Sequence, residues 1–258
     1  MPEDAKGHYQ KAVAIDPVFE DARLNLANLF EKQGRNEEAI HHISEVLRFN
    51  PGSGQAHYNI GVIREKQGSI QEALDHYQSA LIRDPRIEEA RNNLGNLMVE
   101  KGQYKEAIGQ YDKALRINPF YENAHYNMGV ALEKLGRTDE AEDQYHQALK
   151  LSPGLLKAHT NLGGILLGQE RIDAAVRHYT EAVYLEPGRG DVYFNLAVAL
   201  EKQGQREKAI FCYHEALRLD PGLDRARINL GALWLRAGKH DAALIQFKEA
   251  LQRNPEDT

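Results

Sequence analysis

The prolines of this chain recur at one fixed interval, and that interval constrains the fold more than any other feature. Apart from Pro2 they stand 34 residues apart, at 17, 51, 85, 119, 153, 187, 221 and 255. A period of about 20 to 50 residues indicates a solenoid, in which every unit buries its apolar face against its neighbours. With position 1 placed three residues after each proline, the sequence predicts a single array spanning 1–258. It consists of a half repeat at 4–19 and full repeats at 20–53, 54–87, 88–121, 122–155, 156–189, 190–223 and 224–257.

The second half of each repeat has the pattern of one buried helix face, and we call this helix B. Position 20 is always alanine, position 24 is aromatic in every full repeat except the first, which has Ile43, and apolar residues follow at 27 and 28. Spacings of four, seven and eight residues put these side chains on one stripe of a helix. Helix B is therefore predicted to be amphipathic, with a seam at position 20 that admits only a methyl group.

The first half of each repeat predicts another helix, helix A, with a small residue at position 3, an apolar residue at 7 and glycine or alanine at 8. Glycine at position 15 of six repeats suits the left-handed residue that ends a helix. The fifth repeat has Glu170 there and Gly168 two residues earlier, so we expect its turn to differ.

These recurring residues resemble the tetratricopeptide repeat family, which has small residues at positions 8, 20 and 27, an aromatic at 24 and proline at 32. The likeness extends over 4–257. It implies an all-α fold, a right-handed superhelical solenoid of antiparallel helix pairs whose A helices line a concave groove. One departure is position 4, where the family often has tryptophan and this chain has arginine, histidine or tyrosine.

One asparagine occupies position 6 of every full repeat, on the helix A face predicted to line the groove. A row of primary amides can meet the C=O and N–H groups of an extended peptide. The row is similar to the asparagine ladder in the repeat region of protein O-GlcNAc transferase. Alternatively, each amide bonds the neighbouring repeat and sets the stacking. The ladder comprises Asn25, Asn59, Asn93, Asn127, Asn161, Asn195 and Asn229.

A second pattern alternates with a period of 68 residues, because the even repeats carry an aromatic at position 5 and a valine at position 9. These apolar sites predict a ligand with apolar side chains about six residues apart, at roughly 3.3 Å per extended residue. The other interpretation is that the aromatics pack between A helices. The sites are Tyr58, Val62, Tyr126, Val130, Phe194 and Val198.

Several functions are excluded or disfavoured by composition and by missing motifs. A net charge of -6 without any basic run disfavours nucleic acid and anionic membranes as partners. No cofactor is predicted, because phosphate loops and nucleophile elbows are absent, and no metal site, because the eleven histidines form no ligand motif and Cys212 is the only cysteine. No repeat has the lysine at position 5 that the family's clamp for chaperone C-termini needs.

The sequence therefore predicts a non-enzymatic scaffold that binds a protein or an extended peptide. Alternatives are the substrate-recognition region of a larger enzyme such as a glycosyltransferase, and a self-assembling scaffold. Self-assembly is considered because neither end of the array carries a polar cap, and because the chain resembles magnetosome-associated repeat proteins. No span or signal segment is evident, so a cytoplasmic location is expected for what could be a fragment of a longer protein.

Overall fold

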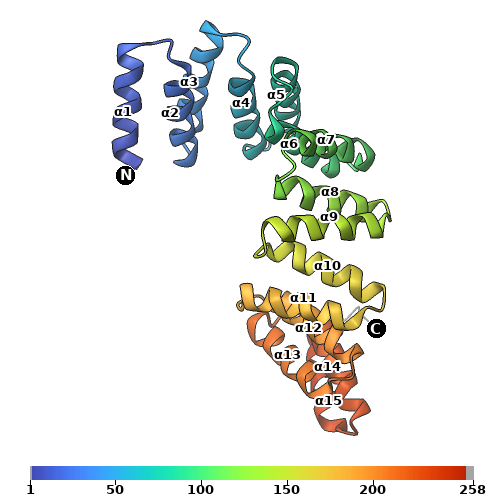
Figure 1. Ribbon diagram of the computed structural model, residues 1–258. Helices are drawn as coiled ribbons and strands as arrows, with labels where there is room; N and C mark the ends of the chain where they lie inside the picture. Colours follow the sequence, from blue (N-terminus) through green and yellow to red (C-terminus); the bar gives the residue numbers. More distant parts are fainter. Residues whose placement is uncertain (1, 254–258) are drawn as a thin grey trace. The chain divides into compact units, whose positions relative to one another are not determined.

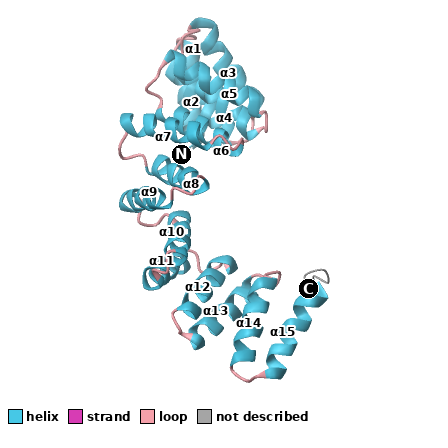
Figure 2. Ribbon diagram, turned by 90° about the vertical axis from the view of Figure 1, so that its right-hand side faces the viewer, coloured by secondary structure: helices cyan, strands magenta, loops and turns pink. Residues whose placement is uncertain are grey.

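The computed structural model describes residues 2–253, with side chains from residue 5 onward, and every regular element in this part is an α-helix. Figures 1 and 2 show the helices following one another as antiparallel pairs. The predicted all-α solenoid of helix pairs is confirmed. Pro255 and the predicted end of the last repeat, 254–257, lie outside the described residues.

The A helices are α2 (Glu20–Lys32), α4 (Gly54–Lys66), α6 (Glu88–Glu100), α8 (Glu122–Lys134), α10 (Leu156–Gly168), α12 (Gly190–Lys202) and α14 (Asp224–Arg236). The B helices are α1 (Pro2–Ile15), α3 (Asn36–Phe49), α5 (Ile70–Arg83), α7 (Tyr104–Ile117), α9 (Thr138–Leu151), α11 (Ile172–Leu185), α13 (Arg206–Leu219) and α15 (His240–Arg253).

The chain divides into two compact units, Met1–Arg137 and Thr138–Thr258, and the division falls between the two helices of the fourth repeat. Within each unit the most extensive contacts join the A and B helices of one repeat, and the next join a B helix to the following A helix. Each repeat that lies within one unit is thus held by its own helix pair and by its neighbours, as expected for a solenoid.

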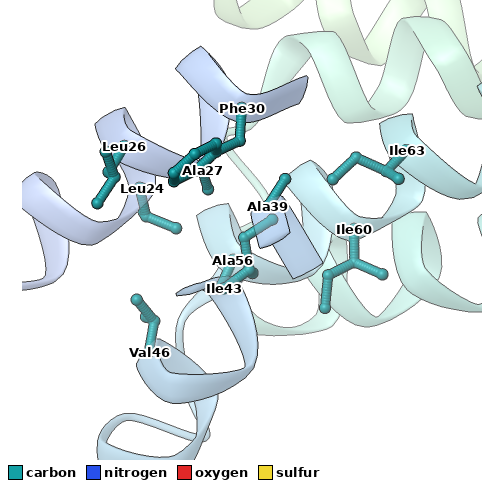
Figure 3. Close-up of a cluster of buried hydrophobic side chains, with 10 residues drawn as sticks. All are labelled: Leu24, Leu26, Ala27, Phe30, Ala39, Ile43, Val46, Ala56, Ile60 and Ile63. Carbon is teal, nitrogen blue, oxygen red and sulfur yellow. The ribbon is translucent and has the colours of Figure 1, made fainter. Parts of the chain in front are cut away.

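Helix A packs on helix B through the predicted small residues. The position 20 alanines are essentially inaccessible, and Ala39, Ala73 and Ala107 have no exposed surface. A methyl group added to Gly61 would approach the Tyr77 ring at 2.7 Å, so the glycine leaves room for this ring where it lies. The first repeat pairs the larger Ala27 with the smaller Ile43, and both lie in the core cluster of Figure 3.

The turn between helix A and helix B uses the left-handed conformation at position 15, as predicted. The six glycines there have φ between 72° and 82°. The expectation that the fifth repeat turns differently is wrong, because Glu170 itself adopts φ 60°. Its turn is closed by the bond from Arg171 N to Leu166 O at 2.8 Å, the counterpart of Arg35 N to Phe30 O at 2.9 Å. The fold therefore imposes this backbone conformation even on a residue with a side chain.

The polar residues at position 4 have a structural role that explains the departure from tryptophan. Their side chains reach the carbonyl of the recurring proline six residues earlier, as in Arg23 Nε to Pro17 O at 2.6 Å and His159 Nε2 to Pro153 O at 2.9 Å. Arg91, His125 and Arg227 make the same contact. Since a carbonyl only accepts, these histidines carry their proton on Nε2. Position 4 thus ties these five A helices to the loops before them.

None of the described helices is long and apolar enough to cross a membrane.

Candidate functional site

The ladder asparagines do not share one environment, although they share one repeat position. Asn25 is exposed, Asn59 is buried with 7% of its surface accessible, and the other five are half-buried. Burial sets Asn59 apart from the other six, and ligand contact by the seven amides stays a prediction. Three of the amides share a type of partner on the preceding helix B.

Three ladder amides donate a hydrogen bond to the position 24 tyrosine of the repeat before them. Asn93 Nδ2 reaches the Tyr77 hydroxyl at 3.2 Å, and the pairs Asn161–Tyr145 and Asn229–Tyr213 have distances of 3.0 and 3.1 Å. All three asparagines belong to odd repeats and all three tyrosines to even repeats. In these repeats the amide N–H contributes to stacking, and Oδ1 is the atom left for other contacts.

Asn59 shows what happens without the tyrosine. The preceding position 24 is Ile43, which has no hydroxyl, and the buried Asn59 Nδ2 has no hydrogen-bond partner. Its Oδ1 accepts from Gln55 Nε2 at 3.0 Å. A buried donor without a partner is unfavourable, so Asn59 is the strained member of the ladder.

Two even repeats add a carboxylate to the tyrosine. The Tyr77 hydroxyl donates to Glu65, and the Tyr213 hydroxyl donates to Glu201 Oε2 at 3.0 Å. Glu65 and Glu201 both occupy position 12 of helix A. Burial, together with the adjacent carboxylates, raises the pKa of both tyrosines far above the ordinary value. Each hydroxyl therefore stays protonated, donates to the carboxylate and accepts from the asparagine.

In the first unit this arrangement extends into a directed chain of side-chain hydrogen bonds. Asn127 Nδ2 donates to Asn92 Oδ1 at 2.9 Å, and Asn92 Nδ2 donates to Asn93 Oδ1 at 3.2 Å. Asn93 then donates to Tyr77, which donates to Glu65. All four bonds point toward the negative charge, an arrangement in which successive bonds polarise one another.

The far end of this chain borders a cavity of about 300 Å³ within the first unit. Asn127 and Val130, both predicted ligand contacts, line it together with residues that the prediction missed. Tyr111 there donates to Asn96 Oδ1 at 2.8 Å, so Asn96 Nδ2 and Asn127 Oδ1 have no bond within the described chain. The other lining residues are Glu65, Val99 and Glu100.

The aromatics of the 68-residue pattern lie against the same tyrosines. Tyr58 packs on Tyr77 with ring centroids 5.9 Å apart, and Phe194 packs on Tyr213 at 6.0 Å. Phe194 is only 9% exposed and lies under the Arg225 guanidinium, 5.1 Å from the ring centroid. Burial raises the pKa of the Tyr58 hydroxyl to about 12. Each ring thus packs on helix B of its own repeat, and both interpretations of these aromatics, packing between A helices and ligand contact, stay predictions.

The remaining apolar sites, Val62, Val130 and Val198, are half-buried, as is Tyr126. The contacts of the A helices show the same alternation. Helices α2 and α4, α6 and α8, and α10 and α12 contact each other more than α4 does α6 or α12 does α14. Tyr58 and Phe194 belong to α4 and α12, the helices that precede the sparser contacts.

The histidines form two pairs rather than a metal cluster. His57 and His76 have Nδ1 atoms 3.2 Å apart, and those of His159 and His178 are 3.0 Å apart. Burial, followed by the neighbouring charges of His159, His146 and Arg177, lowers the pKa of His178 to about 4. Among the described residues no group of three or more potential ligands could hold a metal ion.

Sequence reasoning found the amides but missed their partners, namely Tyr77, Tyr213, Glu65, Glu201 and Asn92. Two signals were present, since glutamate recurs at position 12 and tyrosine at position 24. The contact between them could not be inferred, because it depends on how helix B of one repeat faces helix A of the next.

Comparison with protein-family models gives matches along most of the chain. Models described as tetratricopeptide repeat match 2–54, 24–86, 122–155, 156–189, 190–223 and 225–244. A model described as TPR repeat matches 95–136. No curated protein sequence matches the chain significantly.

Solved structures share the architecture. The chain is similar to MamA from Desulfovibrio magneticus RS-1, with 24% identity, a TM-score of 0.62 and coverage of 66% of this chain and 97% of that one. It is also similar to YrrB, described as a TPR protein with an unusual peptide-binding site, with 25% identity, a TM-score of 0.61 and coverage of 76% and 97%. PilF of Pseudomonas aeruginosa has 20% identity, a TM-score of 0.72 and coverage of 79% and 92%.

Proposed function

The chain belongs to the tetratricopeptide repeat family, and we propose that it is a protein-interaction scaffold whose A helices hold an extended segment of a partner. The observation that carries the proposal is the pair of open amide atoms beside the cavity of the first unit. Asn96 offers a donor at Nδ2 and Asn127 offers an acceptor at Oδ1. An extended peptide presents the complementary C=O and N–H at each residue.

The hydrogen-bond chain behind Asn127 supports this role, because it fixes the amide in one orientation. Asn127 Nδ2 is held by Asn92, which is only 4% exposed, so Oδ1 is the atom that the amide presents to a ligand. An amide fixed in this way loses little conformational freedom on binding. YrrB, similar in fold, is described as having a peptide-binding site, which also favours a peptide as the ligand.

Two further ladder asparagines would take part through a single atom each. Asn161 and Asn229 donate their N–H groups to tyrosines, so they would bind a ligand through Oδ1. Both Oδ1 and Nδ2 of Asn93 are already hydrogen-bonded within the chain. The aromatic and valine sites of the even repeats would contact apolar side chains of the ligand. Each net hydrogen bond contributes about 1 kcal/mol, and ordering a flexible peptide opposes binding by several kcal/mol. The affinity expected is on the order of micromolar.

An array of synthetic extended peptides, probed with the wild-type chain and with Asn96→Ala and Asn127→Ala, tests the proposal. Each variant is expected to lose about three- to tenfold in affinity for captured peptides, since each lacks one contact. Asn36→Ala, on helix α3 and away from the cavity, is the matched control. Equal capture by wild type and both cavity variants, with urea denaturation showing that all are folded, would contradict main-chain recognition at this cavity.

The apolar contacts need a separate experiment. Tyr58→Ala, Tyr126→Ala and Phe194→Ala are compared for peptide affinity, with the stability of each variant measured independently. Tyr58→Ala is expected to weaken binding more than Phe194→Ala, because the Phe194 ring is covered by Arg225. Unchanged affinity in all three variants would remove these aromatics from the site.

A further inference from the structure

The chain pairs charges along its A helices in a fixed register. In two places an acid at position 12 of one repeat bonds a cation at position 13 of the next repeat, 35 residues later. Lys66 pairs with Glu31, and Arg236 Nη1 lies 2.8 Å from Glu201 Oε1. The first example is in the first unit and the second is in the second, so the register is a property of neighbouring repeats.

The sequence breaks this register twice: Glu133 has Gly168 35 residues later, and the other break lies between the second and third repeats. Glu65 at position 12 has Glu100, another acid, 35 residues later. Glu201 accepts from Tyr213 at Oε2 and from Arg236 at Oε1, so both of its oxygens are engaged. Glu65 accepts from Tyr77 at Oε2, and among the described residues no cation pairs with its other oxygen. The equivalent of the Arg236 guanidinium is missing.

A cavity lies where that cation would be. Glu65 and Glu100 both line the space of about 300 Å³, whose other walls include Val99, Val130 and Tyr111. Position 12 of the third repeat is Val99 rather than glutamate, which makes this wall apolar. Lysine and arginine side chains combine a long apolar stem with a charged head, so apolar walls next to two carboxylates suit them.

We propose that this cavity binds a lysine or arginine side chain of the partner segment, with its cationic head between Glu65 and Glu100. The proposal rests on the proposed function, because the same segment would place its main chain on Asn96 and Asn127. The ligand's cation then occupies the position that Arg236 fills between the sixth and seventh repeats. The apolar stem lies along Val99 and Val130.

Synthetic peptides that differ at one central position test the occupant. Lysine, arginine, glutamine or glutamate is placed there in a common background, and affinity for the full chain is measured by fluorescence polarisation. We expect the lysine and arginine peptides to bind about tenfold more tightly than the glutamine peptide, as for a charged hydrogen bond. The glutamate peptide is expected to bind most weakly, and high salt should reduce these differences.

The variant Glu100→Lys supplies the missing cation from the chain itself. It is expected to abolish the preference for basic peptides, while Glu37→Lys, an equal change of charge on helix α3, should retain it. Loss of the preference in both variants would show that net charge alone causes it and would overturn the proposal.

The outcomes separate this inference from the proposed function. Equal affinity for all four peptides would overturn the basic-side-chain site and leave peptide binding standing. No binding by any of the four peptides, or by any peptide of the wider array, would contradict both. A stability measurement tests the geometry without a ligand, because Glu100→Lys should raise the urea midpoint if position 100 faces Glu65.

Discussion

Residues 54–100 of the first unit and 190–236 of the second unit carry the same polar arrangement with one charge inverted. In both, a position 12 glutamate accepts from a tyrosine that also accepts from the asparagine of the next repeat. At position 13 of the next repeat, the second unit has Arg236 and the first unit has Glu100. In the complete version both carboxylate oxygens of Glu201 are engaged in contacts within the array. The interrupted version leaves a carboxylate beside a cavity, and departures from a local rule are where function is expected.

The largest expected effect comes from removing the shared hydroxyl. Tyr77→Phe leaves Glu65 without a bonded partner, whereas Tyr213→Phe leaves Glu201 still paired with Arg236. We therefore expect a loss of about 2 kcal/mol in the free energy of unfolding for Tyr77→Phe and about 1 kcal/mol for Tyr213→Phe. Urea denaturation measures both. Phe247 already occupies this repeat position against Gly231, so the ring itself fits. Equal losses would show that Arg236 does not compensate.

A smaller effect concerns a turn that distinguishes the second unit. Glu170 is the only described non-glycine residue with positive φ, at 60°. Glu170→Gly should stabilise the chain by about 1 kcal/mol, because it removes the strain of a side chain in this conformation. The reciprocal change Gly102→Glu, at the same position of the first unit, should destabilise by a similar amount. No stabilisation by Glu170→Gly would mean that the glutamate side chain compensates for its own strain.

Acid should weaken the His159–His178 pair of the second unit. The folded-state pKa of His178 is lowered from 6.5 to about 4, so the unfolded chain takes up the proton first. Stability is therefore lost as pH falls from about 6.5 toward 4 and is fully present above that range. After discounting for solvent around a half-buried group, the effect is about 0.5–1 kcal/mol. Glutamine occupies the same repeat position at Gln144 and Gln110. The variant His178→Gln should therefore reduce the dependence of the melting temperature on pH over this range. An unchanged pH slope would contradict the assignment.

The smallest effect is expected when the charge at position 100 or 236 is reversed. Glu100→Lys should stabilise by about 0.5 kcal/mol and Arg236→Glu should destabilise by about the same amount, as for partly exposed ion pairs. Both effects should fade in about 1 M salt. Changes of the same sign in the two variants would show that the register of 35 residues does not govern the pairing.

The sequence predicts the fold well because the packing depends on residue size. The alanine at position 20 and the combination of glycine with an aromatic can both be recognised in the sequence. The buried Ala73 and the Gly61–Tyr77 contact follow from them. The turn at Glu170 is predicted wrongly because the preference of glycine for positive φ is weaker than the constraint that the repeated fold places on this position.

The site was predicted less completely, because its properties arise between repeats. The phase of the asparagines is visible, but the burial of Asn59 and the lack of a partner for its Nδ2 atom are not. The break at Val99 and Glu100 is also visible in the sequence. Its meaning depends on knowing that position 12 faces position 13 of the next repeat, and only the contacts show this.

The most direct test of peptide binding at the first unit follows the asparagine side-chain amides by nuclear magnetic resonance during titration with the lysine-centred peptide. The amide signals of Asn96 and Asn127 should shift together and saturably, while the sealed Nδ2 group of Asn59 should stay in place. Saturable shifts confined to residues of the B helices, with Asn96 and Asn127 unmoved, would contradict a ligand site between the A helices.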